Sequence, residues 1–538
     1  MSRDAPDAIG LAVLHHRLAA IAEEMGVLLG RSGFSPNIKE RHDYSCALFD
    51  PEGRMIAHAA HIPVHLGSSP LSVRAALAAH QLAPGDIVVL NDPYAGGTHL
   101  PDVTLVEAVY DRRGRRLGLV ANRAHHADIG GMTPGSMPLA REIQQEGLRL
   151  PPVRLVRGGV VDRDLLTLFL ANTRVPEERL GDLEAQRAAL AVGVRRLREL
   201  ASSIGRERLH TGMAALRRYT ARLVAATLRT LPRGRYRAED VLDDDGLGSG
   251  PVSIRVAITI GEGRAVVDFT GSAPQVEGSL NANYAITLSA VFYVFTALGL
   301  EPIPANEGLL ERIRVVAPSG TVVNADFPAA VAGGNVETSQ RIVDVVLRAL
   351  AKAAPDRIPA ASAGSMSNVA IGGFDRLRGR AFSYYETIAG GAGGGPTRPG
   401  VSAVQTHMTN TWNTPIEVLE TYYPLHVERY AVRRRSGGAG RHPGGDGIVR
   451  ELRFLVDADL TLLTDRRVVA PYGLAGGCAG ATGRNLLTHS GRRGMLPGKI
   501  NLRLRCGDVL RVETPGGGGW GAPPRTVKKN PRPSRRRR

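Results

Sequence analysis

Hydrophobic residues near the amino terminus follow two periods, one typical of helices and one typical of strands. Across residues 9–29 they recur at helical spacing, which predicts a helix that ends at Gly30 or Gly33. Two short apolar runs flank the turn signal at residues 50–53, so we expect a β-hairpin there. A second helix is predicted over residues 69–80, between a Ser-Pro start and a following Pro-Gly stop.

Longer helical periodicity begins at Pro176 and continues to Leu231, with a break near Gly205. This pattern predicts two consecutive helices, a helical hairpin. From Val252 the period changes to two, which indicates paired strands. We therefore predict an α+β, multi-domain protein with mixed sheets, the helical hairpin and many loops rich in Gly and Pro. The expected divisions are a first α/β region (1–175), a helical region (176–235), a second α+β region with Gly-rich loops (236–522) and a disordered basic tail (523–538).

Composition is that of a globular protein, with 43% hydrophobic and 22% charged residues in a chain of 538. The formal net charge of +17 raises the possibility of nucleic-acid binding, but residues 525–538 alone hold eight Lys or Arg and no acid. No nucleic-acid motif accompanies this tail, so nucleic acid is not an expected partner. No stretch has the length to span a membrane, and the three separated cysteines fit a reducing compartment. We expect a cytoplasmic location.

Two apolar runs in the first region, residues 88–103 and 119–131, each stop at a turn that carries imidazoles and carboxylates. We expect the two strand ends to meet. Neutral imidazole together with carboxylate suits Zn, Mn or Fe with open coordination positions, whereas an all-oxygen set suits Mg or Ca. We therefore predict one divalent metal ion that polarises a carbonyl or activates water; the alternative is that these side chains only cap turns. The candidate residues are His99, Asp102, His125, His126 and Asp128.

Other polar segments are candidates for contact with the site. Pro63 argues against a helix that would place His61 and His65 on one face, so these histidines are expected to line the site or to support ligands. The glycine-led segment 332–340 predicts a helix start that either binds an anion or is simply capped. Residues 406–415 are rich in hydrogen-bonding side chains and are predicted to orient a polar substrate such as an imide or a carboxylate.

Three glycine clusters, at residues 389–395, 476–484 and 514–521, lack the full pattern of a phosphate-binding loop and of a dinucleotide-binding fingerprint. We therefore expect this chain not to bind ATP in the usual way. The glycines are expected to let backbone pass close to backbone or to substrate.

Several segments together resemble the hydantoinase B/oxoprolinase family, in order, from about residue 9 to about residue 522. The resemblance therefore covers nearly the whole chain. The segments are residues 35–41, 61–68, 91–94 with 98–102, 124–131, 333–337, 385–391, 406–411 and 514–518.

The resemblance implies a particular division of labour. A separate A-type subunit, an actin-like ATPase, would phosphorylate the substrate oxygen, and the B-type chain would complete ring opening or carboxylation within a hetero-oligomer. In the carboxylase relatives a His-x-x-Asp pair and a later His hold the metal, and the matching residues here are His99, Asp102 and His125. His126 and Asp128 are adjacent and are candidate proton acceptors. Asp92, Glu337, His407 and Asn410, from the segments above, are candidate substrate-binding residues.

The expected reaction is hydrolysis of a small cyclic amide. Such an amide is a poor electrophile, and phosphorylation of its oxygen gives an imidate that water can attack while a metal lowers the pKa of that water. Two alternatives remain open at the level of sequence. One is a component of an acetone- or acetophenone-type carboxylase, which the same ligands would serve. The other is a non-catalytic scaffold for the A-type partner.

Overall fold

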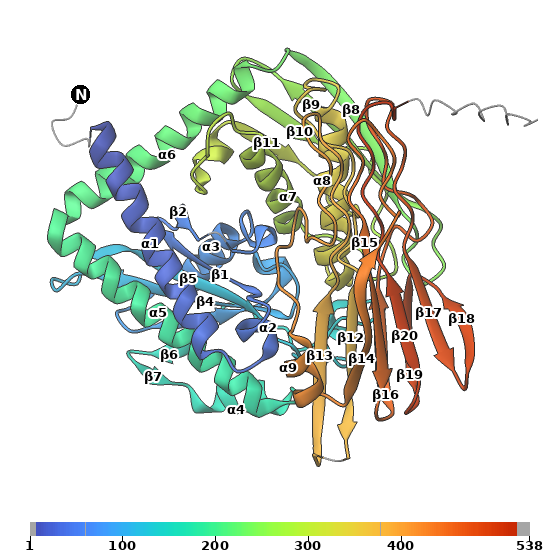
Figure 1. Ribbon diagram of the computed structural model, residues 1–538. Helices are drawn as coiled ribbons and strands as arrows, with labels where there is room; N and C mark the ends of the chain where they lie inside the picture. Colours follow the sequence, from blue (N-terminus) through green and yellow to red (C-terminus); the bar gives the residue numbers. More distant parts are fainter. Residues whose placement is uncertain (1–6, 60, 377, 525–538) are drawn as a thin grey trace, which may run out of the picture.

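The computed structural model describes residues 7–59, 61–376 and 378–524, so the predicted basic tail lies almost wholly outside the described residues. Four β-sheets and the helices packed on them make up this part of the chain, in agreement with the predicted α+β, multi-domain class. Figure 1 shows the amino-terminal half on one side and the carboxyl-terminal sheets, in orange and red, on the other. Among the described residues, no helix is both long enough and apolar enough to cross a membrane.

The first sheet carries the candidate metal ligands. It has seven strands in the order β2-β1-β5-β4-β3-β6-β7, and each strand is antiparallel to its neighbours. The predicted hairpin is present as β1 and β2. The strands are β1 (Tyr44–Phe49), β2 (Met55–His58), β3 (Ile87–Leu90), β4 (Asp102–Tyr110), β5 (Arg116–His125), β6 (Val153–Arg157) and β7 (Val160–Val161).

Both faces of this sheet are buried, which explains why its central strands are continuous apolar runs in the sequence. Successive side chains of a strand point to opposite faces, so Val88 and Leu90 enter one hydrophobic core whereas Ile87 and Val89 enter another. Helices α1 (Ala8–Ser32) and α5 (Pro176–Ile204) cover the second of these faces. Both helices cross the sheet in Figure 1.

The predicted ends of several helices are confirmed. Helix α1 ends at Ser32 with Gly33 as its C-cap, and Gly205 separates α5 from α6 (Arg206–Arg229). The predicted helix over residues 69–80 is α3 (Ser69–Ala79). The remaining helices near the first sheet are α2 (Pro36–Lys39), α4 (Arg163–Ala171) and the 3-10 turns η1 (Pro63–His65), η2 (Pro93–Ala95) and η3 (Ile143–Gln145).

A second, four-stranded sheet in the order β11-β10-β9-β8 packs on two buried helices, α7 and α8, and shares its core with one face of the first sheet. The pairing of β10 with β11 is parallel and the other pairings are antiparallel, so the sheet is mixed as predicted. The elements are β8 (Gly234–Leu242), β9 (Val252–Ile260), β10 (Ala265–Asp268), α7 (Tyr284–Ala297), η4 (Glu307–Glu311), β11 (Ile313–Val316), the π-helix η5 (Gly334–Thr338) and α8 (Ser339–Leu350).

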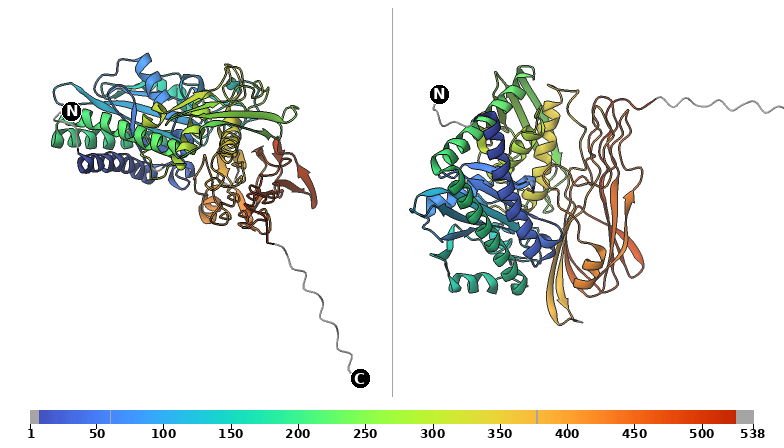
Figure 2. Two further views of the ribbon diagram at one scale, coloured as in Figure 1. Left: turned by 90° about the horizontal axis from the view of Figure 1, so that it is seen from above. Right: turned by 60° about the vertical axis from the view of Figure 1, so that its left-hand side comes forward.

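Two further sheets form the carboxyl-terminal side of the molecule, which both views of Figure 2 show as a separate layer. Their strand orders are β13-β12-β16-β19 and β14-β15-β20-β17-β18, and a third hydrophobic core lies between them. The elements are β12 (Asn368–Asp375), β13 (Arg380–Thr387), α9 (Ile416–Tyr422), β14 (Leu425–Arg433), β15 (Gly447–Phe454), β16 (Ala458–Leu463), β17 (Arg484–His489), β18 (Arg492–Leu496), β19 (Lys499–Leu504) and β20 (Val509–Glu513).

The glycine clusters lie in extended segments that pack backbone against backbone. The amide of Gly391 donates to the carbonyl of Pro515, and the amide of Gly517 donates to the carbonyl of Gly445. A Cβ atom at Gly391 would lie 1.9 Å from the carbonyl oxygen of Gly445, which excludes any side chain there. The expectation that these glycines permit close approach of backbone is confirmed.

Candidate metal centre

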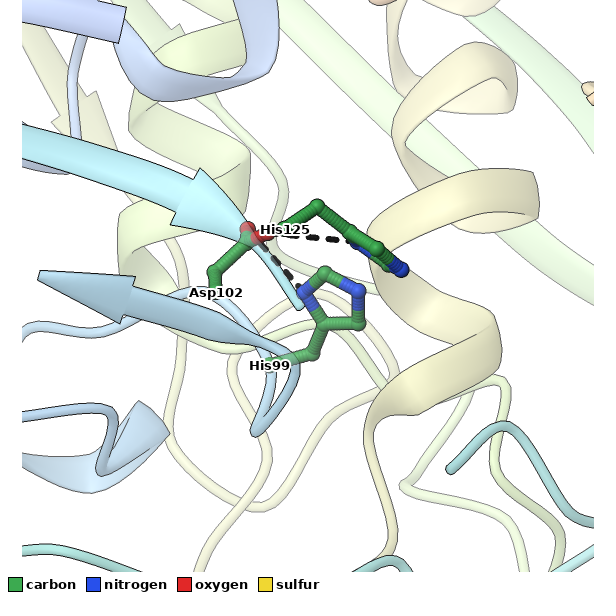
Figure 3. Close-up of side chains that lie close together, drawn as sticks. All are labelled: His99, Asp102 and His125. Atoms are coloured by element: carbon green, nitrogen blue, oxygen red, sulfur yellow. Dashed lines mark ion pairs between the residues drawn. The ribbon is translucent and has the colours of Figure 1, made fainter. Parts of the chain in front are cut away.

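The hairpin of β4 and β5 brings three predicted ligands together. Asp102 is the first residue of β4 and pairs in register with His125, the last residue of β5, while His99 lies in the turn just before β4. In Figure 3 the two imidazoles converge on the Asp102 carboxylate. The distances are 3.0 Å from His99 Nδ1 to Asp102 Oδ2 and 3.4 Å from His125 Nδ1 to Asp102 Oδ1. All three side chains are buried, and their ligand atoms lie within 4.8 Å of one another.

The donor set fits a divalent transition metal. Two imidazole nitrogens and one carboxylate oxygen leave coordination positions open, as catalytic Zn, Mn and Fe sites require. In the described part of the chain, His125 Nε2 is buried without a hydrogen-bond partner, whereas His99 Nδ1 contacts only the Asp102 carboxylate. The three residues are therefore the ones that would hold the ion.

The electrostatics of the three residues also suit metal binding. Burial lowers the pKa of His99, which keeps this imidazole neutral and able to donate a lone pair. For Asp102, burial alone would raise the pKa, but the contacts with His99, His65 and His125 outweigh it and hold the pKa well below its usual range. A neutral imidazole beside an ionised carboxylate is the protonation pattern that ligation needs.

Two further polar side chains contact the Asp102 carboxylate and fix its orientation. His65 Nε2 lies 3.3 Å from Asp102 Oδ2, and its Nδ1 lies 2.8 Å from Ser45 Oγ. The hydroxyl of Thr98 donates to the same carboxylate oxygen. The sequence predicted a supporting or lining role for the histidines around Pro63, and the 3-10 turn that Pro63 begins directs His65 inward.

A stack of aromatic and cationic groups holds His125. The ring of Tyr385 is stacked on its imidazole, with centroids 4.6 Å apart and planes at 17°. The guanidinium of Arg41 lies 5.1 Å from the centroid of the same tyrosine ring. The hydroxyl of Tyr385 donates to Asn368 Oδ1 at 2.6 Å. The sequence indicated either a surface salt bridge or a contribution to the site for Arg41, and the buried guanidinium excludes the surface position. It indicated no role for Tyr385 or Asn368, although Tyr385 lies within a segment that carries the family resemblance.

His126 and Asp128 have other partners. His126 Nε2 lies 2.9 Å from Gln186 Oε1, and burial lowers the pKa of this histidine to about 4. The carboxylate of Asp128 accepts from the amides of Gly130 and Gly135 and forms an ion pair with Arg174 at 3.0 Å. The contacts of Asp128 stabilise the conformation of its loop. A role of His126 or Asp128 in proton transfer stays a prediction.

Two of the four predicted substrate-binding residues have local structural partners. Asp92 caps the η2 turn by accepting from the Tyr94 amide at 2.9 Å, and it forms an ion pair with Arg149 at 3.0 Å. Glu337 lies in the π-helix η5, and its Oε1 accepts from Asn368 Nδ2 at 2.9 Å. Burial raises the pKa of Glu337 to about 8, and its Oε2 has no hydrogen-bond partner among the described residues.

The π-helix also brings an amide to the centre. Asn335 Nδ2 lies 3.4 Å from His99 Nε2, so η5 contacts the ligand group directly. Turns of π-helix inside α-helices are frequent at functional sites. Gly334, the first residue of η5, permits close packing, because a Cβ atom there would lie 2.0 Å from the carbonyl oxygen of Asn281.

The other two predicted substrate-binding residues belong to the polar segment 406–415. The side chain of His407 is only 8% exposed, with its Nδ1 3.4 Å from the hydroxyl of Tyr293 and its Nε2 3.7 Å from Asp344 Oδ1. Asn410 is exposed, and its Nδ2 donates to the carbonyl of His61 at 3.3 Å. The two side chains therefore lie in different environments.

Comparison with known proteins gives a consistent result across the chain. The model of the family described as hydantoinase B/oxoprolinase matches residues 7–523. An uncharacterized protein of Methanocaldococcus jannaschii is 41% identical over 96% of this chain and 91% of its own length. A putative D-/L-hydantoinase subunit of the B type from a Pseudomonas species is 30% identical over 96% of this chain and 90% of its own length.

Some relatives are much longer proteins. 5-Oxoprolinase 1 of Arabidopsis thaliana is 38% identical over 97% of this chain, but this chain spans only 42% of its length. Among solved structures, the ATP-dependent caprolactamase of Pseudomonas jessenii has a TM-score of 0.89 at 30% identity, with 96% of this chain and 91% of that chain covered. Acetone carboxylase, at 18% identity and a TM-score of 0.86 over 95% of this chain and 76% of that chain, shares the fold. The chain therefore belongs to the hydantoinase B/oxoprolinase family.

Proposed function

We propose that this chain is the B-type component of an ATP-dependent amidohydrolase, and that it completes the hydrolytic ring opening of a small cyclic amide. A separate A-type ATPase subunit would phosphorylate the amide oxygen. The observation that carries the proposal is the buried His99, Asp102 and His125 group in a chain of this family. The names of the hydantoinase and caprolactamase relatives support a cyclic amide as substrate.

The group of three would hold a divalent ion, Zn, Mn or Fe. Bound there, the ion would supply Lewis acidity toward a substrate oxygen and would lower the pKa of a water molecule. The chain itself contributes a dry, fixed setting, since all three side chains are buried and Thr98 and His65 hold the Asp102 carboxylate in one orientation.

His126 remains the stronger of the two predicted proton acceptors. Its Nε2 is engaged by Gln186, while its Nδ1 is buried without a partner in the described part of the chain, so one ring nitrogen is free to accept a proton. Asp128 is instead engaged by Arg174 and by backbone amides, which would weaken it as a base. We propose that Asp128 positions the loop after β5.

Substrate contact is proposed for the four residues that the sequence singled out. Asn410 and His407 come from one segment, and Glu337 lies two residues beyond Asn335, which contacts His99. A carboxyl group with a raised pKa, as in Glu337, is neutral at physiological pH and can donate a hydrogen bond to a carbonyl oxygen. Asp92 would act through Arg149, to which it is bound.

We propose that the hydrolysis takes place in the cytoplasm. The three cysteines are free thiols, which suits a reducing compartment. Carboxylation of a ketone is a second candidate because the fold is shared with acetone carboxylase and the same ligands would serve. A purely scaffolding role would leave the buried ligand group without a purpose.

The test is co-expression with an A-type subunit, followed by measurement of substrate-dependent ATP turnover and product formation. 5-Oxoproline, hydantoins, caprolactam and simple ketones would be compared, with and without bicarbonate. The proposal expects ring-opened product from a cyclic amide and none from the His99→Ala variant. Turnover of ketones alone, with bicarbonate consumed, would instead favour the carboxylase.

A further inference from the structure

A surface pocket of about 610 Å³ opens beside the polar segment, outside the metal centre. Gln405, Asn410, Trp412 and Asn413 line one part of it, and Tyr430 of β14 lines another. None of its lining residues is Asp, Glu, Lys, Arg or His. The pocket is therefore uncharged and largely apolar with a few side-chain amides, which does not suit an ionic ligand.

The side-chain amides of this pocket offer hydrogen-bond acceptors. Gln405 Nε2 is used by the protein itself, since it donates to the carbonyl and hydroxyl of Thr387 at 3.3 and 3.1 Å. Asn410 Nδ2 is likewise used by the carbonyl of His61. No described residue donates a hydrogen bond to the side-chain oxygen of Gln405 or Asn410, so both oxygens can accept from an N–H group of a ligand.

Two aromatic rings complete the pocket, and each is supported on one side. The ring of Trp412 lies 4.6 Å from that of His42 and is 64% exposed. The ring of Tyr430 has the Arg450 guanidinium 4.6 Å from its centroid and is 41% exposed. A ring held from behind loses little freedom when a flat ligand packs on its open face.

We propose that this pocket binds a neutral, flat cyclic amide, such as a lactam or a hydantoin ring, before the ring reaches the metal centre. The class of ligand rests on the proposed function, whereas the position of the site follows from the pocket and its lining residues. Acceptor oxygens match the ring N–H groups, and the aromatic faces match the ring plane. A ring that carries a carboxylate, as 5-oxoproline does, would find no cation among the lining residues.

A layer of buried side chains connects the pocket to the metal centre. Thr411 of the pocket shares a hydrogen bond with Thr387 at 2.9 Å, and Arg41 donates to Thr387 at 3.0 Å. Arg41 in turn packs on Tyr385, which is stacked on His125. The pocket is thus separate from the metal centre but adjacent to the residues that hold it.

The chain provides its own reporter for a binding experiment. It has two tryptophans, and Trp520 is only 7% exposed, so a ligand at Trp412 would change the emission of the exposed one. The purified chain, without a partner subunit or ATP, would be titrated with hydantoin, 2-pyrrolidinone, 5-oxoproline and acyclic acetamide, by fluorescence and by calorimetry. The proposal expects saturable binding of hydantoin and 2-pyrrolidinone, and binding of 5-oxoproline and acetamide that is about tenfold weaker or absent.

Variants separate this pocket from the metal centre. Asn410→Leu removes an exposed acceptor and should weaken hydantoin binding about tenfold by calorimetry. Tyr422→Ala removes an exposed aromatic ring outside the pocket and should leave hydantoin binding unchanged. His99→Ala should also bind hydantoin normally.

Three results would overturn the inference: no binding of either neutral ring, equal binding of 5-oxoproline, or binding lost in His99→Ala and kept in Asn410→Leu. None of these readouts depends on turnover. Failure of the proposed function would instead appear as a chain that fails to bind metal or to open a ring with its partner.

Discussion

The ring of Tyr385 lies flat against the imidazole of His125, with centroids 4.6 Å apart. The two residues belong to different sheets, and their contact joins the carboxyl-terminal half of the chain to the metal centre. Because Asn368 fixes the tyrosine hydroxyl and Arg41 packs on the ring, the orientation of His125 is set by residues that bind no metal.

This contact predicts that Tyr385 controls metal affinity. Tyr385→Leu removes the ring and should weaken binding of Zn²⁺ or Mn²⁺ about 10- to 100-fold, the usual effect of losing a group that orients a ligand. Tyr385→Phe keeps the stack and loses only the bond to Asn368, so its effect should be smaller. Competition with a chromophoric chelator measures both affinities. Equal affinity in the wild type and Tyr385→Leu would contradict this role.

A second prediction concerns the pH dependence of stability. Glu146 is buried, its Oε1 accepts from the amides of Val331 and Ala332, and burial raises its pKa from 4.5 to about 8. The folded protein therefore holds this proton over a range in which the unfolded chain releases it. The stability linked to Glu146 is complete below about pH 4.5 and falls by roughly 1.4 kcal/mol per pH unit up to about pH 8.

Glu146→Gln removes this titration and keeps the oxygen that accepts the two amides. The melting temperature of the variant should therefore rise relative to that of the wild type as the pH increases from about 5 to about 8. The control is Glu142→Gln, because Glu142 is exposed and its replacement should leave the pH profile of the melting temperature unchanged. Parallel pH profiles of wild type and Glu146→Gln would show that burial does not raise the pKa of this carboxyl.

A third prediction concerns the glycine-rich segments. In Gly391→Ala the new Cβ would meet the carbonyl of Gly445 at 1.9 Å, and the neighbouring extended backbones have no flexible side chain to move. We expect the free energy of unfolding to fall by about 3 kcal/mol or more, because overpacking of this kind forces the backbone to shift. Gly494→Ala, at an open position in β18, should change stability little. Urea denaturation of both variants checks this.

Much of the fold follows from local patterns. The helix ends at Gly33 and Gly205, the first hairpin and the change from helical to strand period are all set by neighbouring residues in the sequence. His99, Asp102 and His125 were predictable as one group for the same reason, since a single hairpin brings them together.

Contacts between distant segments were not predictable in this way. Tyr385 reaches His125 across 260 residues of chain and from another sheet, and no local period encodes that approach. His125 and His126 also differ in the direction in which their side chains point. The imidazole of His125 faces Asp102, whereas that of His126 contacts Gln186. Adjacent positions in an extended chain point to opposite sides, and which side holds the metal depends on the tertiary packing.

The central claim is that His99, Asp102 and His125 hold one catalytic metal ion. The most direct measurement is the metal content of the purified chain after reconstitution with Zn²⁺, Mn²⁺ or Fe²⁺ and removal of excess ion, determined by plasma mass spectrometry. The account predicts near-stoichiometric metal in the wild type, its loss in His99→Ala, and its retention in His489→Ala, which changes an exposed histidine of β17. Metal retained in full by His99→Ala, or no metal in the wild type, would contradict it.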